Sequence, residues 1–169
     1  MSDTLTVAVL DAPPPAFCCG REELDGWLAR HGLQVTRSGS ARVYLAHRDG
    51  QLVGYFALSA GAVEHDSAGV RTRRGMSRHP VPAVLLARLA VAEEAQGQGV
   101  GRELVRSAAG LTVRASRLVA VRALVVDALD ERVAEFYAKV GFTPNEANPL
   151  RLEVLVKDLD ALGSAHAAE

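Results

Sequence analysis

The apolar segment 81–91, VPAVLLARLAV, constrains the fold most, because a glycine-rich loop and then a helical pattern follow it directly. A nearly continuous apolar run of this kind predicts a central, buried strand of a sheet. The loop contains Gly97, Gly99 and Gly101, although glycine loses more backbone freedom on folding than any other residue. Bare amides ahead of a helix N-terminus favour anions. The sequence therefore predicts a phosphate-binding loop here.

The loop differs from two well-known phosphate-binding patterns. Its residues are Gly97-Gln98-Gly99-Val100-Gly101-Arg102. A dinucleotide fingerprint would need its third glycine where Arg102 stands, and no Gly-Lys pair follows to form a P-loop. A glycine turn that binds no ligand therefore remains an alternative interpretation. Counted from Gln96, the pattern that remains is Q-x-x-G-x-G.

Periodicity and turn residues predict the remaining elements. We expect strands at 4–10, 117–128 and 151–159, a hairpin at 41–63, and helices at 21–33, 101–116 and 130–142. Asp130 should cap the last helix, and Gly141 should end it as a left-handed residue. The order predicts an α/β fold with a mixed sheet, helices on both faces and a right-handed β-α-β unit around the glycine loop.

Length and composition limit the class of protein. The chain has 169 residues and a net charge of −1, so no overall basic field indicates nucleic-acid binding. We expect one domain over 1–160 and a frayed tail over 161–169. No apolar run approaches the roughly 18–20 residues of a membrane span, and no secretory signal is evident, so we expect a cytoplasmic protein. The adjacent Cys18 and Cys19 form no disulfide framework or metal pattern, and we expect no metal.

The arginines are unevenly distributed. Four of them lie within a polar loop expected at 64–79: Arg71, Arg73, Arg74 and Arg78. Such a run can be a solvated surface, or it can contact phosphates through forked donors. Arg88 lies on the predicted strand 81–91. It must be paired or face a cleft, because burying a lone charge is costly.

Two motifs resemble those of the Gcn5-related N-acetyltransferase (GNAT) family. One is Q-x-x-G-x-G, and the other is EFYAKVGF at 135–142, which is similar to the family's FYxxxGF. The resemblance implies a mostly antiparallel sheet whose parallel pair, 81–91 and 117–128, splays apart. It also implies acetyl-CoA as the acetyl donor, held by its pyrophosphate on the loop amides. Asp130 replaces a common Asn, but it can cap a helix equally well.

The resemblance also assigns roles to residues. Strand backbone near Leu89 and Val91 would pair with pantetheine, Phe136 would pack against that arm, and Tyr137 would protonate the leaving thiolate. Tyr137 can instead be a core residue with a hydrogen-bonded hydroxyl. The expected acetyl-CoA-binding residues are Leu89, Ala90, Val91, Gln96, Gly97, Gln98, Gly99, Val100, Gly101, Arg102, Asp130 and Phe136, with Tyr137 as the catalytic residue.

Further segments resemble the acetyltransferase toxins of bacterial toxin–antitoxin modules. LDGWL at 24–28, within FCCGREELDGWL, and PVPAVLLARLAV at 80–91 are the more specific parts, and the resemblance extends over 17–159. It implies acetylation of the α-amine of aminoacyl-tRNA, arrest of translation, a ribbon-helix-helix antitoxin as partner and a homodimer. The tRNA contacts would come from the arginines already named: Arg71, Arg73, Arg74, Arg78 and Arg88.

The chemistry of the acceptor is consistent with this substrate. The attacking amine must be neutral, and an α-amine with a pKa of about 7.7–8.0 is partly neutral, whereas a lysine amine near 10.4 must first lose a proton. Glu64, His65 and His79 are the candidates for a general base, and each can equally be a solvated loop residue. Two alternatives stay open: acetylation of a small amine or a protein N-terminus, and a CoA-binding module without turnover.

Overall fold

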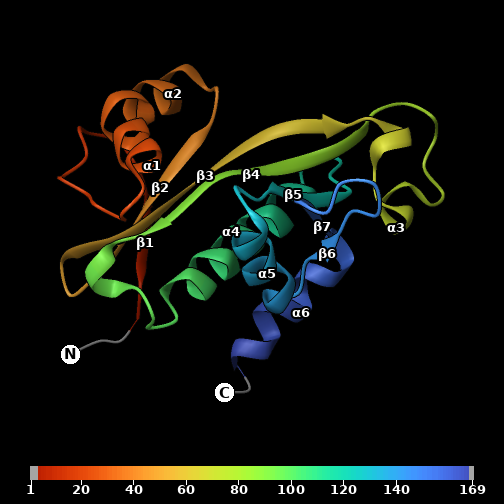
Figure 1. Cartoon of the computed structure of the whole chain (residues 1–169). Helices are drawn as coiled ribbons and strands as arrows, with labels where there is room; N and C mark the ends of the chain where they lie inside the picture. Colours follow the sequence, from red (N-terminus) through yellow and green to blue (C-terminus); the bar gives the residue numbers. More distant parts are fainter. Residues whose placement is uncertain (1–3, 168–169) are drawn as a thin grey trace. The chain divides into compact units, whose positions relative to one another are not determined.

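The computed structural model describes residues 4–167 and contains one mixed β-sheet (Figure 1). Its strands are β1 (Thr6–Val9), β2 (Arg42–Arg48), β3 (Gln51–Val63), β4 (Val81–Val91), β5 (Ala123–Asp127), β6 (Thr143–Pro144) and β7 (Arg151–Leu155), in the spatial order β1-β2-β3-β4-β5-β7-β6. β4 and β5 pair in parallel, with Ala83 opposite Ala123 and Leu86 opposite Val126. The pairs β1–β2, β2–β3, β5–β7 and β6–β7 are antiparallel. The predicted mixed sheet with one parallel pair is confirmed.

Helices connect the strands. They are α1 (Glu22–Trp27), a π-helical turn (Leu28–Gly32), α2 (Leu33–Ser38), a 3-10 turn (His65–Ser67), α3 (Val70–Arg73), a second 3-10 turn (Glu93–Ala95), α4 (Val100–Ser116), α5 (Glu131–Val140) and α6 (Val156–Ala167). The predicted helix 21–33 therefore continues to Ser38. Gly32 has helical backbone angles, with φ of −53° and ψ of −50°. A Cβ there would lie 3.1 Å from Leu28 and 3.2 Å from Leu10, so glycine permits close packing. Gly39, with φ of 80°, ends the run instead.

Three predicted strands are shorter than expected, and the strand expected at 4–10 spans only Thr6–Val9. The segment expected at 117–128 forms β5 only from Ala123, because Leu118 and Val119 donate N–H groups to Ala115 and continue the end of α4 as a turn. The strand expected at 151–159 ends at Leu155, and α6 begins at the next residue. Leu155 and Leu159 are both buried. Their spacing of four residues fits one face of a helix as well as one face of a strand.

The chain divides into two compact units. Unit 1 comprises the residues up to Ser59 together with Ala87–Ser107, and unit 2 comprises Ala60–Leu86 together with the residues from Ala108 onward. Each has its own apolar cluster: Leu28, Val43 and Tyr55 are central in unit 1, and Val81, Ala123 and Val125 in unit 2. The domain boundary at 160 and the fraying of 161–169 stay predictions; α6 extends to Ala167, and 168–169 lie outside the described residues.

Candidate active site

The glycine loop of unit 1 has the backbone geometry that a phosphate-binding loop needs. Gly97 and Gly99 have φ angles of 78° and 82°, which side-chain-bearing residues rarely adopt. A Cβ placed on either would meet no atom within 4 Å, so the loop is open on that side. Val100 is 1% exposed and anchors the first turn of α4 in the core. The loop therefore has a fixed base and accessible amides at a helix N-terminus.

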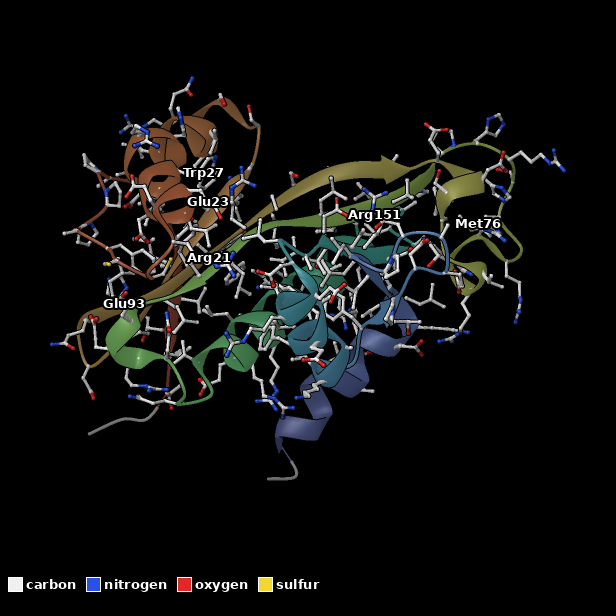
Figure 2. The ribbon with its side chains drawn as sticks, in the orientation of Figure 1. Arg21, Glu23, Trp27, Met76, Glu93 and Arg151 are labelled. Carbon is white, nitrogen blue, oxygen red and sulfur yellow. The ribbon has the colours of Figure 1, made fainter. Side chains whose placement is uncertain are left out.

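The side chain of Gln96 explains why the motif begins with glutamine. Its Nε2 donates to the carbonyl oxygen of Val91 at 2.9 Å and to that of Cys19 at 2.8 Å. Glu93, labelled in Figure 2, adds a backbone bond from its N–H to the Cys18 carbonyl at 2.9 Å. Both amide hydrogens of Gln96 are thus used to attach the loop to the end of β4 and to the segment before α1. Its side chain positions the loop.

Arg48, at the end of β2, is a residue of this loop region that the sequence analysis missed. Its Nη1 donates to Oε1 of Gln98 at 3.3 Å, and its Nη2 lies 3.5 Å from Oε1 of Glu103. Its Nε is buried, with no hydrogen-bond partner among the residues that the structure describes. Arg48 therefore brings a largely buried positive charge next to the proposed phosphate site. In the sequence, only the position of Arg48 just before the hairpin turn could have indicated that it lies beside the glycine loop.

Arg88 is paired, as its position on β4 required. Its guanidinium carbon lies 4.9 Å from the centroid of the Trp27 ring, a cation–π contact. Trp27, labelled in Figure 2, stacks in turn on Tyr55, with ring centroids 6.2 Å apart. The Tyr55 hydroxyl donates to the Leu24 carbonyl at 2.7 Å. The aromatic ring of Trp27 thus holds the guanidinium group of Arg88. The contact of Arg88 with substrate stays a prediction.

Tyr137 lies on α5 in unit 2. It is 4% exposed and packs edge-on against Phe136 and Phe142, with centroids 5.1 and 5.3 Å away. Burial raises the pKa of Tyr137 well above its ordinary value, because the phenolate would be desolvated. Among the described residues of its own unit, none hydrogen-bonds its hydroxyl. Tyr137 is therefore a neutral phenol with a proton to donate.

The ends of α5 are formed as predicted. The Asp130 carboxylate accepts the Val133 N–H at 2.9 Å, which confirms the N-cap. Gly141 has φ of 130°, and a Cβ there would collide with the Leu162 side chain, so glycine is required. The role of Asp130 in binding acetyl-CoA stays a prediction.

The arginines of the expected 64–79 loop form a structured segment rather than an irregular one. Arg71 and Arg73 lie on α3; Arg71 pairs with Asp158 at 3.1 Å, and Nη1 of Arg73 donates to the Ala68 carbonyl at 2.8 Å. Arg74 and Arg78 are exposed. No ion pair involves these two among the described residues, so they are free to meet an external anion.

The structure assigns the predicted site residues to both units. Unit 1 holds Arg88, Leu89, Ala90, Val91, Gln96, Gly97, Gln98, Gly99, Val100, Gly101 and Arg102, while unit 2 holds Asp130, Phe136, Tyr137 and the other arginines. Of the candidate bases, Glu64 and His79 are exposed, and His65 pairs with Asp66 at 3.4 Å. Within residues 4–167 no cluster of His, Cys, Asp or Glu could hold a metal ion. No described helix is both long and apolar enough to cross a membrane.

A parallel strand pair, an open glycine loop before α4 and a buried phenol on α5 are features of an acyl-transferring α/β enzyme. Residues 39–144 match the family described as acetyltransferase (GNAT) domain. The chain belongs to the GNAT family of acetyltransferases, and the predicted fold and enzyme class are confirmed.

Individual relatives and solved structures show which members of the family the chain is similar to. The chain is 40% identical over 147 residues to a tRNA-acetylating toxin of Mycobacterium tuberculosis (strain ATCC 25618 / H37Rv), covering 87% of this chain and 88% of the relative. It is similar to AtaT complexed with acetyl-methionyl-tRNAfMet, with a TM-score of 0.85, 30% identity and coverage of 94% and 99%. It is also similar to an AtaT variant bound to acetyl-CoA and the C-terminus of the antitoxin AtaR, with a TM-score of 0.79, 31% identity and coverage of 96% and 99%. The resemblance to acetyltransferase toxins is confirmed.

Proposed function

We propose that this chain transfers the acetyl group of acetyl-CoA to the α-amine of aminoacyl-tRNA and thereby blocks translation as the toxin of a toxin–antitoxin module. The observation that carries the proposal is the open glycine loop. Its φ angles at 97 and 99 are ones that favour glycine, and the Gln96 side chain attaches its start to the end of β4. The 40% identity to a tRNA-acetylating toxin supports the choice of acceptor.

The donor would be held by residues of the loop and of β4. Amides of residues 97–101 and the positive end of the α4 dipole would hold the pyrophosphate. The exposed Arg102 would add electrostatic attraction, and Arg48 would offset the negative charge of Glu103 beside the loop. The backbone of Leu89–Val91 would pair with the pantetheine arm, and Phe136 would pack against it.

The reaction needs one proton donor and one neutral amine. The amine nitrogen attacks the thioester carbonyl carbon, a C–N bond forms, and the C–S bond breaks. Tyr137 gives its hydroxyl proton to the departing thiolate and regains one as the acetylated amine loses its own. Because the α-amine of an aminoacyl ester is substantially neutral near pH 7–8, we propose that no dedicated general base takes part.

The proposal includes partners and a place of action. The exposed Arg74 and Arg78, with Arg71, would contact the phosphates of the acceptor stem. A ribbon-helix-helix antitoxin would neutralise the enzyme, which would act in the cytoplasm as a homodimer, so that two chains contribute one basic surface. Similarity to AtaT bound to its antitoxin supports an antitoxin partner.

The test is acetyl transfer to defined acceptors. The purified chain is incubated with acetyl-CoA and one acceptor at a time, and the release of free CoA is measured. The acceptors are aminoacylated tRNA, the same tRNA without its amino acid, a peptide with a free N-terminus, and a small amine. We expect CoA release only with aminoacylated tRNA. Transfer to the peptide or small amine alone would overturn the tRNA part and keep the acetyltransferase, whereas acetyl-CoA binding without turnover on any acceptor would indicate a binding module.

A growth test addresses the toxin part. Expression of the wild type without antitoxin should arrest growth, and Tyr137→Phe should relieve the arrest. Tyr44→Phe removes a hydroxyl from a half-buried tyrosine of β2 that stacks on Phe56, so it is the matched control and should remain toxic. Normal growth with the wild type would refute the toxin assignment.

A further inference from the structure

Arg122, the residue before β5, holds the carboxyl end of α3. Its Nε donates to the carbonyl oxygen of Thr72 at 2.9 Å, and its Nη2 donates to the carbonyl oxygens of Arg71 and Arg74, each at 3.1 Å. The last carbonyls of a helix have no partner within the helix. A planar guanidinium with several donors suits this position, because it satisfies three acceptors at once.

Glu153, on β7, holds the opposite end of α3. Its two carboxylate oxygens accept the N–H of Gly69 at 3.0 and 3.1 Å, and one of them also accepts the Asn145 side-chain amide at 2.8 Å. Glu153 is 5% exposed. Glu146 supplies a second carboxylate, which accepts the Val70 N–H at 3.3 Å. Negative charge at the amino end and positive charge at the carboxyl end both complement the helix dipole.

α3 depends on these contacts because it cannot be stable by itself. It spans only Val70–Arg73, a single turn, and isolated short helices are marginal in water. A pocket of about 130 Å³ adjoins it, lined by residues 69–72 and by Val154 and Leu155 of β7, so α3 is not completely packed against that strand. Beyond α3, Met76 packs against the apolar cluster of unit 2 and fixes the following turn (Figure 2).

We propose that Arg122 and Glu153 are positioning residues for the acceptor nucleic acid, which hold α3 so that the exposed guanidinium groups of Arg74 and Arg78 meet backbone phosphates in a fixed arrangement. The inference rests on the proposed tRNA-acetylating function and deepens it. Neither positioning residue contacts the tRNA. Both act by reducing the conformational freedom that the arginine segment would otherwise lose on binding.

Glu153→Gln gives a sharp test, because charge and positioning predict opposite results. The substitution removes a negative charge and by electrostatics alone should strengthen the binding of RNA. Positioning predicts the reverse, because both carboxylate oxygens accept the Gly69 N–H, so the –NH2 group of a glutamine would face that donor in either orientation. We expect KM for aminoacyl-tRNA to rise about tenfold, with KM for acetyl-CoA and kcat within about twofold. Glu135→Gln makes the same charge change on the exposed face of α5 and should not weaken tRNA binding.

Arg122 variants provide the second test, at a less buried position. Arg122→Gln should raise KM for aminoacyl-tRNA about tenfold, and Arg122→Lys should recover part of that loss because an ammonium group serves fewer carbonyls in a fixed plane. A plot of log affinity against log salt concentration should become less steep in both variants, by the amount that corresponds to the loss of about one phosphate contact. Arg114→Gln removes an exposed charge on α4 and is the matched control.

The outcomes separate the inference from the proposed function. A double variant, Arg74→Gln with Arg78→Gln, tests the arginine surface directly. If it weakens tRNA binding while the Glu153 and Arg122 variants do not, the positioning role is wrong and the proposed function stands. Full recovery by Arg122→Lys, with a wild-type salt slope, would show that Arg122 contacts phosphate itself. If the wild type does not acetylate tRNA, both proposals fail. If Glu153→Gln does not fold, the Arg122 variants decide.

Discussion

Arg48 and Glu103 form an ion pair, with Nη2 of Arg48 3.5 Å from Oε1 of Glu103, and it joins the end of β2 to the first turn of α4. The side chains are only 16% and 24% exposed. Because Arg48 also bonds to Gln98 within the glycine loop, the pair both fixes the loop and neutralises a carboxylate next to the proposed phosphate site.

Arg48→Ala should therefore weaken the binding of acetyl-CoA about tenfold, because it frees the loop and leaves the Glu103 carboxylate unpaired near a dianion. Isothermal titration with acetyl-CoA measures the effect. Arg42→Ala, at the exposed start of the same strand, is the control and should leave Kd unchanged. An unchanged Kd in the Arg48 variant would show that the loop binds its ligand without this ion pair.

Two glycine-to-alanine substitutions should change the free energy of unfolding in opposite directions. Gly99→Ala places a side chain at φ of 82° and should reduce the free energy of unfolding by about 1–2 kcal/mol. Gly110 lies within α4, where a Cβ would meet no atom within 4 Å, so Gly110→Ala should add about 0.5–1 kcal/mol. Urea denaturation of both variants checks the pair. Equal effects would contradict the conformational argument.

Gln96→Glu should loosen the loop although it is nearly isosteric. A carboxylate cannot donate to the carbonyl oxygens of Val91 and Cys19, and it places negative charge against both. We expect a loss of about 2–3 kcal/mol in the free energy of unfolding and weaker binding of acetyl-CoA. Gln51→Glu, at the exposed start of β3, is the matched control. Equal stability of the two variants would argue against the anchoring role.

The pH dependence of the reaction should be one-sided. Burial raises the pKa of Tyr137 above its ordinary value of about 10, so the phenol keeps its proton at every lower pH. The value of kcat/KM for aminoacyl-tRNA should rise with pH until the α-amine is neutral and show no descending limb below about pH 10. Tyr137→Phe should lower kcat about 10²–10⁴-fold. A descending limb near neutral pH would indicate a different proton donor.

Local patterns predicted the backbone of the loop and its neighbours well. β4 has the predicted bounds 81–91, and the Asp130 cap forms as expected. The failures occur where one local pattern fits two structures. Leu155 and Leu159, four residues apart, lie on one face in a strand as well as in a helix, so their pattern did not show that β7 ends at Leu155 and α6 follows.

The predicted site lacked the residues that hold it in place. Q-x-x-G-x-G is a local motif, so it could be found, whereas Arg48 is 50 positions from Gln98 and Glu153 is 84 positions from Gly69. No spacing rule brings such residues together without the sheet register. The four arginines at 71–78 looked equivalent in the sequence, but Arg73 is held by the Ala68 carbonyl and Arg71 by Asp158.

The division of the chain limits how the enzyme can be dissected. Unit 1 takes its residues from two separate stretches, and β3, β4 and α4 each contribute to both units. A deletion that spans the whole of β3, β4 or α4 therefore removes residues from both units together. Single substitutions, which leave the packing of both units in place, are therefore better inactive forms for growth assays than internal deletions are.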